Sequence, residues 1–296
     1  MLARSLTCWS FLVAAVATVS AFPGNPEQAR QLFEKGQALL AECDLAGALQ
    51  AYESAAQADP EDLNYQVGAA ILGRVIKIRE MLPQLADTPK WAPALKAVYS
   101  YCLDNRAYAE ALNQANTFHA KQADSESAAM VANVRLETGD NALAVEVIEA
   151  LPIDKRANDS WVLLGIAQAR LDRAAEAKAA LQAIQPTEKP DASLLFDQAR
   201  INSLLGDQAA AGECLTLAFE NTPPSRLDAA KAKAQANADL VKLRDQAAFA
   251  KVMETESKIP ESKCSGGASC GSCPSKGTCG SAGKQDGEHK ECEKKP

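Results

Sequence analysis

The side chains with the clearest capacity for chemistry are cysteines near the C-terminal end of the chain. Four of them occur in the stretch CSGGASCGSCPSKGTC, with the spacing C-x5-C-x2-C-x5-C. Thiolates two residues apart are typical ligands of tetrahedral zinc, and four soft ligands complete its coordination shell. The candidate metal ligands are Cys264, Cys270, Cys273 and Cys279, with His289 and Cys292 as further candidates.

The same cysteines have two alternative interpretations. They could be oxidised, and because residues 261–296 hold five cysteines, one thiol would remain for an intermolecular disulfide bond. They could also belong to an extension without a defined role. Residues 261–296 contain no Val, Leu, Ile, Phe, Tyr, Trp or Met. We therefore expect residues 259–296 to form a Gly/Ser/Lys/Cys-rich disordered tail unless metal or cross-links order it.

The segment CGSCPSKGTC resembles, over about ten residues, the cysteine segment of P-loop ATPases that assemble iron–sulfur clusters. Those proteins also carry a C-x2-C-P-x4-C run. The nucleotide-binding motif G-x4-G-K-[ST] does not occur in this chain, so the ATPase part of the resemblance is missing. The resemblance adds an iron–sulfur cluster to zinc as a cofactor that the tail could hold.

The N-terminal residues have the pattern of an export signal. Arg4 provides a positive charge, an apolar run extends from about Leu6 to Val19, and Val19-Ser20-Ala21 offers small residues for cleavage. The run is shorter than the ~20 residues that a spanning helix needs. We expect residues 1–21 to be a signal peptide, with a retained anchor as the alternative. The mature protein would then be periplasmic or secreted, without a transmembrane segment after cleavage.

Composition narrows the classes of partner. The chain of 296 residues has a net charge of -7, and aromatic residues make up 5% of it. Nucleic-acid binding needs a basic stripe or stacking platforms, so we expect no nucleic-acid partner. Only His119 and His289 could serve histidine-based catalysis, and Gly267–Gly271 matches G-x-S-x-G without a flanking strand or helix. We therefore expect the protein not to be an enzyme.

Small residues recur at a fixed interval through the middle of the chain. Ala48, Ala111, Ala144, Ala177 and Ala211 are separated by 63, 33, 33 and 34 residues. Twelve residues before each alanine stand Gly36, Tyr99, Ala132, Gly165 and Ala199, so four of the five earlier positions are also small. Small residues at both positions let two helices approach closely, and the first interval has room for one further copy between Asp62 and Pro93.

This spacing, with the motif W-x2-L-G at Trp161, Leu164 and Gly165, resembles the tetratricopeptide repeat (TPR), a helix-turn-helix of 34 residues. The resemblance covers about residues 26–222. It implies an all-α, right-handed superhelical solenoid of about six repeats, and residues 224–260 resemble the capping helices that end such arrays. The expected solenoid domain, including this cap, spans residues 22–258.

The resemblance also implies a function. TPR solenoids commonly bind a peptide or a partner protein in a groove lined by the first helix of each repeat. We therefore expect a protein-interaction scaffold in an exported compartment, with a metal carrier or assembly factor that uses the tail cysteines as the alternative. The groove residues implied by the repeat register are Lys96, Ser100, Asn133, Glu137, Ile166, Arg170, Phe196 and Arg200.

Overall fold

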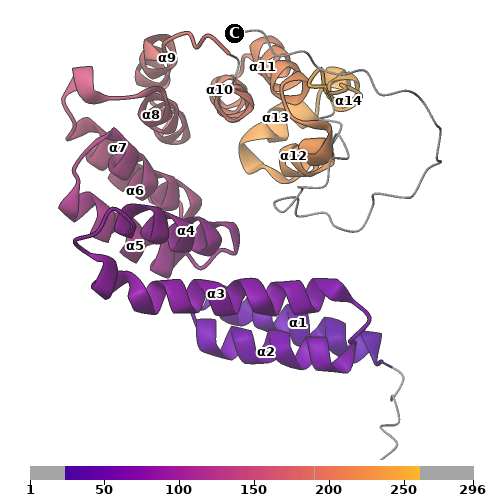
Figure 1. The fold of residues 1–296 in the computed structure, drawn as a ribbon. Helices are drawn as coiled ribbons and strands as arrows, with labels where there is room; N and C mark the ends of the chain where they lie inside the picture. Colours follow the sequence, from indigo (N-terminus) through magenta and orange to yellow (C-terminus); the bar gives the residue numbers. More distant parts are fainter. Residues whose placement is uncertain (1–23, 190, 261–296) are drawn as a thin grey trace, which may run out of the picture. The chain divides into compact units, whose positions relative to one another are not determined.

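The computed structural model describes residues 24–189 and 191–260, and all of the regular structure in these ranges is helical (Figure 1). Successive α-helices are joined by short turns, and two short 3-10 helices interrupt the series. In chain order the elements are α1 Pro26–Ala41, α2 Leu45–Ala58, α3 Leu63–Leu85, α4 Trp91–Asp104, α5 Tyr108–Lys121, α6 Ser125–Glu137, α7 Asn141–Glu149, η1 Ile153–Lys155, α8 Asn158–Arg170, α9 Ala174–Ala183, α10 Ala192–Leu205, α11 Gln208–Glu220, α12 Pro224–Ala236, η2 Ala238–Leu240, α13 Val241–Arg244 and α14 Ala247–Met253.

The predicted helix pairs are present as five hairpins, α1–α2, α4–α5, α6–α7, α8–α9 and α10–α11. Capping residues define where the helices begin. The Asn25 side chain accepts from the backbone N–H of Gln28, with Pro26 in the first turn, and Asp44 accepts from Gly47. Such caps satisfy donors that have no partner inside the helix.

One backbone conformation recurs at every hairpin turn. In the described part of the chain, five residues have positive φ, and each stands five residues before one of the spaced alanines: Cys43, Arg106, Gly139, Asp172 and Gly206. A left-handed residue ends the first helix and redirects the chain into the second. Three of the five positions hold a residue other than glycine. The backbone conformation of the turn therefore recurs even where the turn position does not hold glycine.

The small residues of the repeat lie where the helices of a hairpin cross. All five spaced alanines are fully buried. At Gly36, an added Cβ would lie 2.5 Å from the Tyr52 ring, and at Gly165 it would lie 2.7 Å from Ile201. These distances are shorter than van der Waals contact, so the absence of a side chain sets the spacing of the helices.

The helix pair expected between Asp62 and Pro93 is not formed. This segment is the single helix α3, which is longer than any other helix in the described part of the chain. Leu63 to Leu85 offers no positive-φ residue and no internal cap, and its only proline, Pro83, lies in the last turn. Because the segment lacks a turn signal, the helix continues, and the described residues form five hairpins plus α3 rather than about six repeats.

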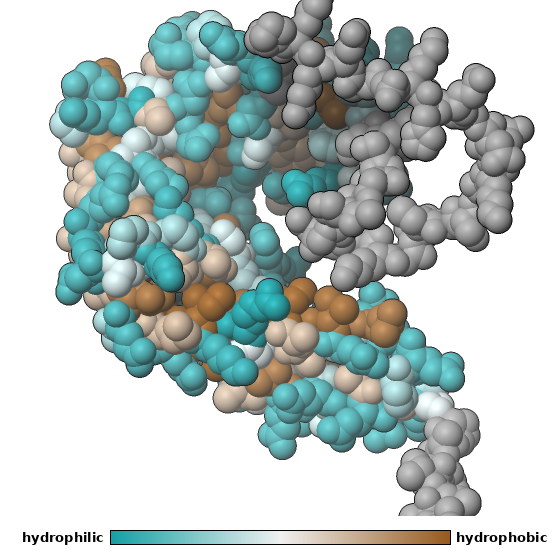
Figure 2. Space-filling view, in the orientation of Figure 1, coloured by the Kyte–Doolittle hydropathy of each residue, from teal (hydrophilic) through white to brown (hydrophobic). Residues whose placement is uncertain are grey.

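Because α3 has no second helix of its own, part of its surface stays uncovered. Four of its large apolar side chains are exposed, and Figure 2 shows apolar residues gathered along this helix. They are Leu63, Val67, Ile71 and Met81. A large apolar surface of this kind is uncommon on a monomeric protein.

The last helical elements, α12, η2, α13 and α14, which we call the cap, pack against α10 and α11. Leu240, Leu243, Phe249 and Val252 are buried in one core cluster with residues of α10 and α11. No helix in the described part of the chain is long and apolar enough to cross a membrane.

Candidate functional site

The structure separates the eight predicted groove residues into three groups. Ile166 is fully buried and belongs to a core cluster with residues of α6, α7 and α10, so its assignment to a groove surface is wrong. Its helix α8 is packed on nearly all sides, with Val162 to Ala169 buried without a break. A helix enclosed by neighbours buries positions that would face a groove in a less enclosed repeat.

Arg170 and Arg200 do not project into open solvent; they meet one carboxylate. Asp239, in η2, accepts from Nε and Nη2 of Arg170 at 2.9 Å and from Nε of Arg200 at 2.9 Å. The side chains of Asp239 and Arg200 are only 5% and 6% exposed. These groups tie the cap to α8 and α10, so their first role is to hold the end of the repeat array.

The remaining predicted residues lie at or near the surface. Ser100 and Glu137 are exposed, and Lys96 pairs with Glu126 at 2.5 Å. Phe196 is nearly buried and lines a small hollow, where the Lys233 amine lies 4.9 Å from its ring centre. Asn133 lines a larger hollow, which is the candidate functional site.

This site, which we call the acidic hollow, has a volume of about 370 Å³ and is formed by α4, α6, α8 and α10. Its lining holds four carboxylates and no basic side chain, over a floor of small and apolar residues. The lining residues are Tyr99, Glu126, Ala129, Met130, Asn133, Asp159, Val162, Leu163, Asp191, Ser193, Leu194 and Asp197.

Three of the four carboxylates come together because they lie at the start of a helix, and the fourth, Asp197, lies further along α10. Glu126 and Asp159 lie in the first turns of α6 and α8, and Asp191 caps α10 by accepting from Ser193 at 2.8 Å. Acidic residues are favoured at helix N-termini by the helix dipole. Stacking of consecutive hairpins then places these helix starts beside one another. The acidic residues of separate helices therefore form one negatively charged surface.

Two of the four carboxylates already have a cationic partner at the edge of the hollow. Glu126 pairs with Lys96, and Asp197 pairs with Arg200 at 2.7 Å. Asp191 is held by backbone N–H groups. Asp159 makes no hydrogen bond or ion pair with any other described residue, so its charge is the one most available to a ligand.

The pKa of Asp159 is raised above its usual value. The first cause is partial desolvation by the surrounding helices, and the charges of Asp191, Asp197 and Glu126 add to it. A bound cation would relieve the repulsion among the four carboxylates.

The described part of the chain contains no group of three or more His, Cys, Asp or Glu residues placed to hold a metal ion, and this includes the acidic hollow. The predicted tail ligands Cys264, Cys270, Cys273, Cys279, His289 and Cys292 lie outside the described residues, as does the predicted signal peptide.

Comparison with known proteins gives one solved structure to report. No protein-family model and no curated protein matches the chain. The chain is similar to a tetratricopeptide repeat protein from Parabacteroides merdae ATCC 43184, with 16% identity, a TM-score of 0.41, and coverage of 77% of this chain and 93% of that one.

The fold itself is TPR-like. It is an all-α array of helical hairpins whose buried small residues and left-handed turns recur every 33 or 34 residues from Ala111 to Ala211. Proteins of this architecture commonly act as scaffolds for protein interactions and are typically non-enzymatic.

The sequence did not reveal the acidic hollow as a site. Asn133 was assigned to the groove, but Asp159, Asp191 and Asp197 were not, since an acid at a helix start, or one turn from an arginine of its own helix, has an ordinary local explanation. The signal that could have revealed them is the recurrence of acids at the starts of alternate helices.

Proposed function

We propose that the protein is a non-enzymatic interaction scaffold whose acidic hollow binds a lysine- or arginine-containing segment of a partner protein. The observation that carries the proposal is the convergence of four carboxylates, one of them without a partner among the described residues, on a hollow between first helices of consecutive hairpins. A cationic side chain would neutralise the repulsion around Asp159 while its methylene stem packs on Val162 and Leu163.

The test is a comparison of two acetylated peptides of equal length, one rich in lysine and one rich in glutamate, by isothermal titration calorimetry. We expect the lysine peptide to bind and its affinity to fall as salt increases, because exposed charges are screened. The glutamate peptide should not bind. Equal binding of both peptides would contradict the proposal.

Two matched variants locate the binding. Asp159→Asn removes one charge from the hollow and should weaken the lysine peptide about fivefold. Asp154→Asn makes the same change at an exposed position outside the hollow and should leave affinity unchanged. Equal effects of the two variants would indicate a nonspecific response to net charge.

We propose in addition that the protein is exported, on the pattern of residues 1–21, and matures after Ala21. The N-terminal sequence of protein recovered from the producing cells tests this. A mature chain that begins at Phe22 is expected, and a chain that retains Leu6 to Val19 would contradict cleavage.

The spacing of the tail cysteines favours a second candidate function, the carriage or assembly of zinc or an iron–sulfur cluster. Metal analysis of protein purified under reducing conditions, with and without residues 261–296, tests it. Metal that is bound only when residues 261–296 are present would support this candidate function. Equal metal content in both proteins would exclude it. Five free thiols within residues 261–296 of protein taken directly from the exported compartment would exclude the disulfide alternative.

A further inference from the structure

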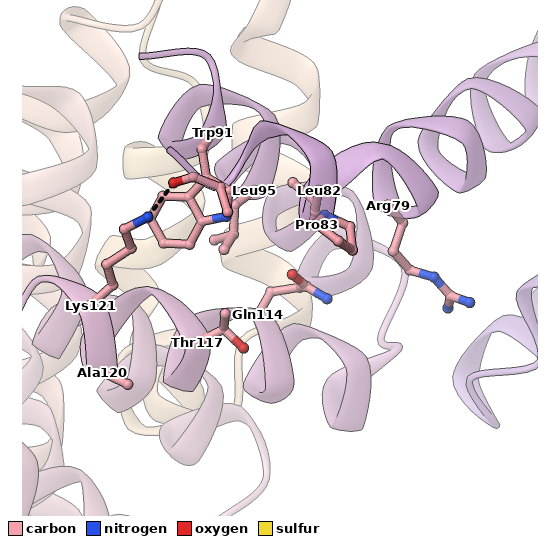
Figure 3. Close-up of a pocket in the computed structure, with 10 residues that line it drawn as sticks. Arg79, Leu82, Pro83, Trp91, Leu95, Gln114, Thr117, Ala120 and Lys121 are labelled. Carbon is pink, nitrogen blue, oxygen red and sulfur yellow. Dashed lines mark hydrogen bonds between the residues drawn. The ribbon is translucent and has the colours of Figure 1, made fainter. Parts of the chain in front are cut away.

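A second hollow, of opposite character, lies between α3, α4 and α5. Its volume is about 540 Å³, and its walls are mainly apolar (Figure 3). The only charged side chains in the lining are basic. The lining residues are Arg79, Leu82, Pro83, Ala86, Trp91, Leu95, Gln114, Thr117, Ala120 and Lys121. It forms where α3 runs on as a single helix and does not return as a hairpin.

The polar groups are few and fixed in position. The Lys121 amine donates to the carbonyl oxygen of Ala86 and lies 4.6 Å from the centre of the Trp91 ring. Its one carboxylate neighbour, Asp87 at 3.6 Å, is fully exposed. An ammonium group has three N–H donors, so Lys121 can donate a hydrogen bond to a ligand oxygen while it keeps its hydrogen bond to Ala86.

The opposite end of the hollow is less strongly basic. Arg79 has Glu110 at 3.7 Å, and Glu110 also accepts from the Gln114 amide at 2.8 Å. Gln114 is only 5% exposed, and Figure 3 shows its carboxamide turned toward the hollow. Lys121 is therefore the cation best placed for a ligand anion, with the indole ring of Trp91 beside it.

From these contacts we infer that this hollow binds an alkyl carboxylate, with the carboxylate on Lys121 and the alkyl chain along Trp91, Leu82 and Pro83. The volume falls in the range of about 300–1,000 Å³ that is typical of small-molecule sites, which are mostly apolar with a few placed polar groups. A peptide backbone would need partners for each of its N–H and C=O groups. Besides the two basic side chains, the lining side chains offer only Gln114, Thr117 and the indole N–H for that purpose.

The test uses three probes with the same ten-carbon chain and different head groups: decanoate, decanol and decyltrimethylammonium. Each is titrated below its micelle concentration into the full-length protein by isothermal titration calorimetry. We expect decanoate to bind about tenfold more tightly than decanol, because the lysine supplies a charge-assisted hydrogen bond. The cationic probe should bind most weakly. Equal affinities for decanoate and decanol would overturn the assignment of Lys121.

Three variants place the site. Lys121→Met keeps the apolar stem and should lower decanoate affinity about tenfold with little effect on decanol. Thr117→Phe fills the hollow from an exposed position and should abolish binding of both probes. Lys77→Met removes an exposed lysine of α3 that does not line the hollow, and it should change neither affinity.

Other outcomes would overturn the inference. Unchanged decanoate binding in Thr117→Phe, with native circular dichroism, would place the ligand elsewhere. Tighter binding of an acetylated leucine–glutamate peptide than of decanoate would assign the hollow to a protein partner. An emission change of Trp91 on addition of decanoate, measured with Trp9 and Trp161 replaced by phenylalanine, is expected; no change would also contradict the site.

Discussion

Replacement of Asp239 by asparagine tests how the end of the repeat array is held. Asp239 accepts three hydrogen bonds from two guanidinium groups, each over 2.9 Å, and its side chain is 5% exposed. Asparagine keeps the size of the side chain, removes the charge and turns one acceptor into a donor. Arg200 would then lie nearly buried with only Asp197 as its counter-ion.

The size of the expected loss in the free energy of unfolding depends on the partners that Arg170 and Arg200 keep in the variant. Removal of one partner of a buried ion pair costs about 3–5 kcal/mol, because the other charge is left uncompensated. Here Arg200 keeps Asp197, and Arg170 keeps a hydrogen bond to the Leu136 carbonyl and is 20% exposed. We therefore expect the lower end of that range, a loss of about 3 kcal/mol in the free energy of unfolding.

Urea unfolding followed by circular dichroism gives this value, with Asp245→Asn as the control. Asp245 lies in the same cap but is exposed, so its replacement should change stability by less than about 0.5 kcal/mol. If Asp239→Asn were as mild as the control, the account of the cap would be refuted.

The pH dependence gives a second readout on the same residue. Burial alone would raise the pKa of Asp239, but the hydrogen bonds from Arg170 and the charge of Arg200 outweigh burial and lower it. A carboxyl group with a lowered pKa stabilises the folded state above its unfolded pKa of about 3.9, and this contribution is lost as the pH falls through the folded value. The difference in stability between wild type and Asp239→Asn should therefore shrink in acid.

Three further predictions test the repeat and the acidic hollow. Gly36→Ala should destabilise the protein by about 1–3 kcal/mol, because the new Cβ would meet the Tyr52 ring. Gly73→Ala, where the nearest side chain is 3.8 Å from the new Cβ, should instead stabilise the protein by about 0.5–1 kcal/mol. Urea unfolding measures both changes, and equal effects would refute the packing argument. Asp172→Gly should raise stability by about 1 kcal/mol, because φ of 58° favours glycine, and a lower melting temperature would contradict the turn assignment. Asp159→Asn should raise the melting temperature slightly while it lowers the affinity for the lysine peptide, because a carboxyl group with a raised pKa carries a charge that opposes folding above that pKa. For the same reason, the affinity of the wild-type protein for the peptide should begin to fall, as the pH is lowered, at a pH above the usual aspartate range. A fall in affinity only below that range would contradict the raised pKa.

The hairpins were predictable because helix crossing demands small residues at fixed positions. The alanines from Ala48 to Ala211 identified each crossing, and all are buried as that requirement dictates. The turns were less visible, since Cys43, Arg106 and Asp172 adopt positive φ without being glycine. The missing hairpin at α3 was misjudged because spacing alone shows room for a repeat and does not show whether the chain turns within it.

The groove was harder to predict because it depends on how completely each helix is enclosed. The register placed Ile166 on the groove, but α8 has neighbours on nearly every side and buries it. Three acids of the hollow were explained by their own helix starts and Asp197 by its pairing with Arg200 in the same helix, and their common location depends on stacking between hairpins. Similarly, nothing local to Arg170 indicates that Asp239, 69 residues later, accepts its hydrogen bonds.

A charge reversal at Asp159 tests the central claim, that the acidic hollow selects a cationic segment, most directly. The measurement is the ratio of affinities for the lysine and glutamate peptides in wild type and in Asp159→Lys, by isothermal titration calorimetry at low salt. We predict that wild type favours the lysine peptide and that the variant loses this preference or reverses it, because the reversed charge would repel lysine. An unchanged preference for the lysine peptide in a folded Asp159→Lys variant would contradict the claim.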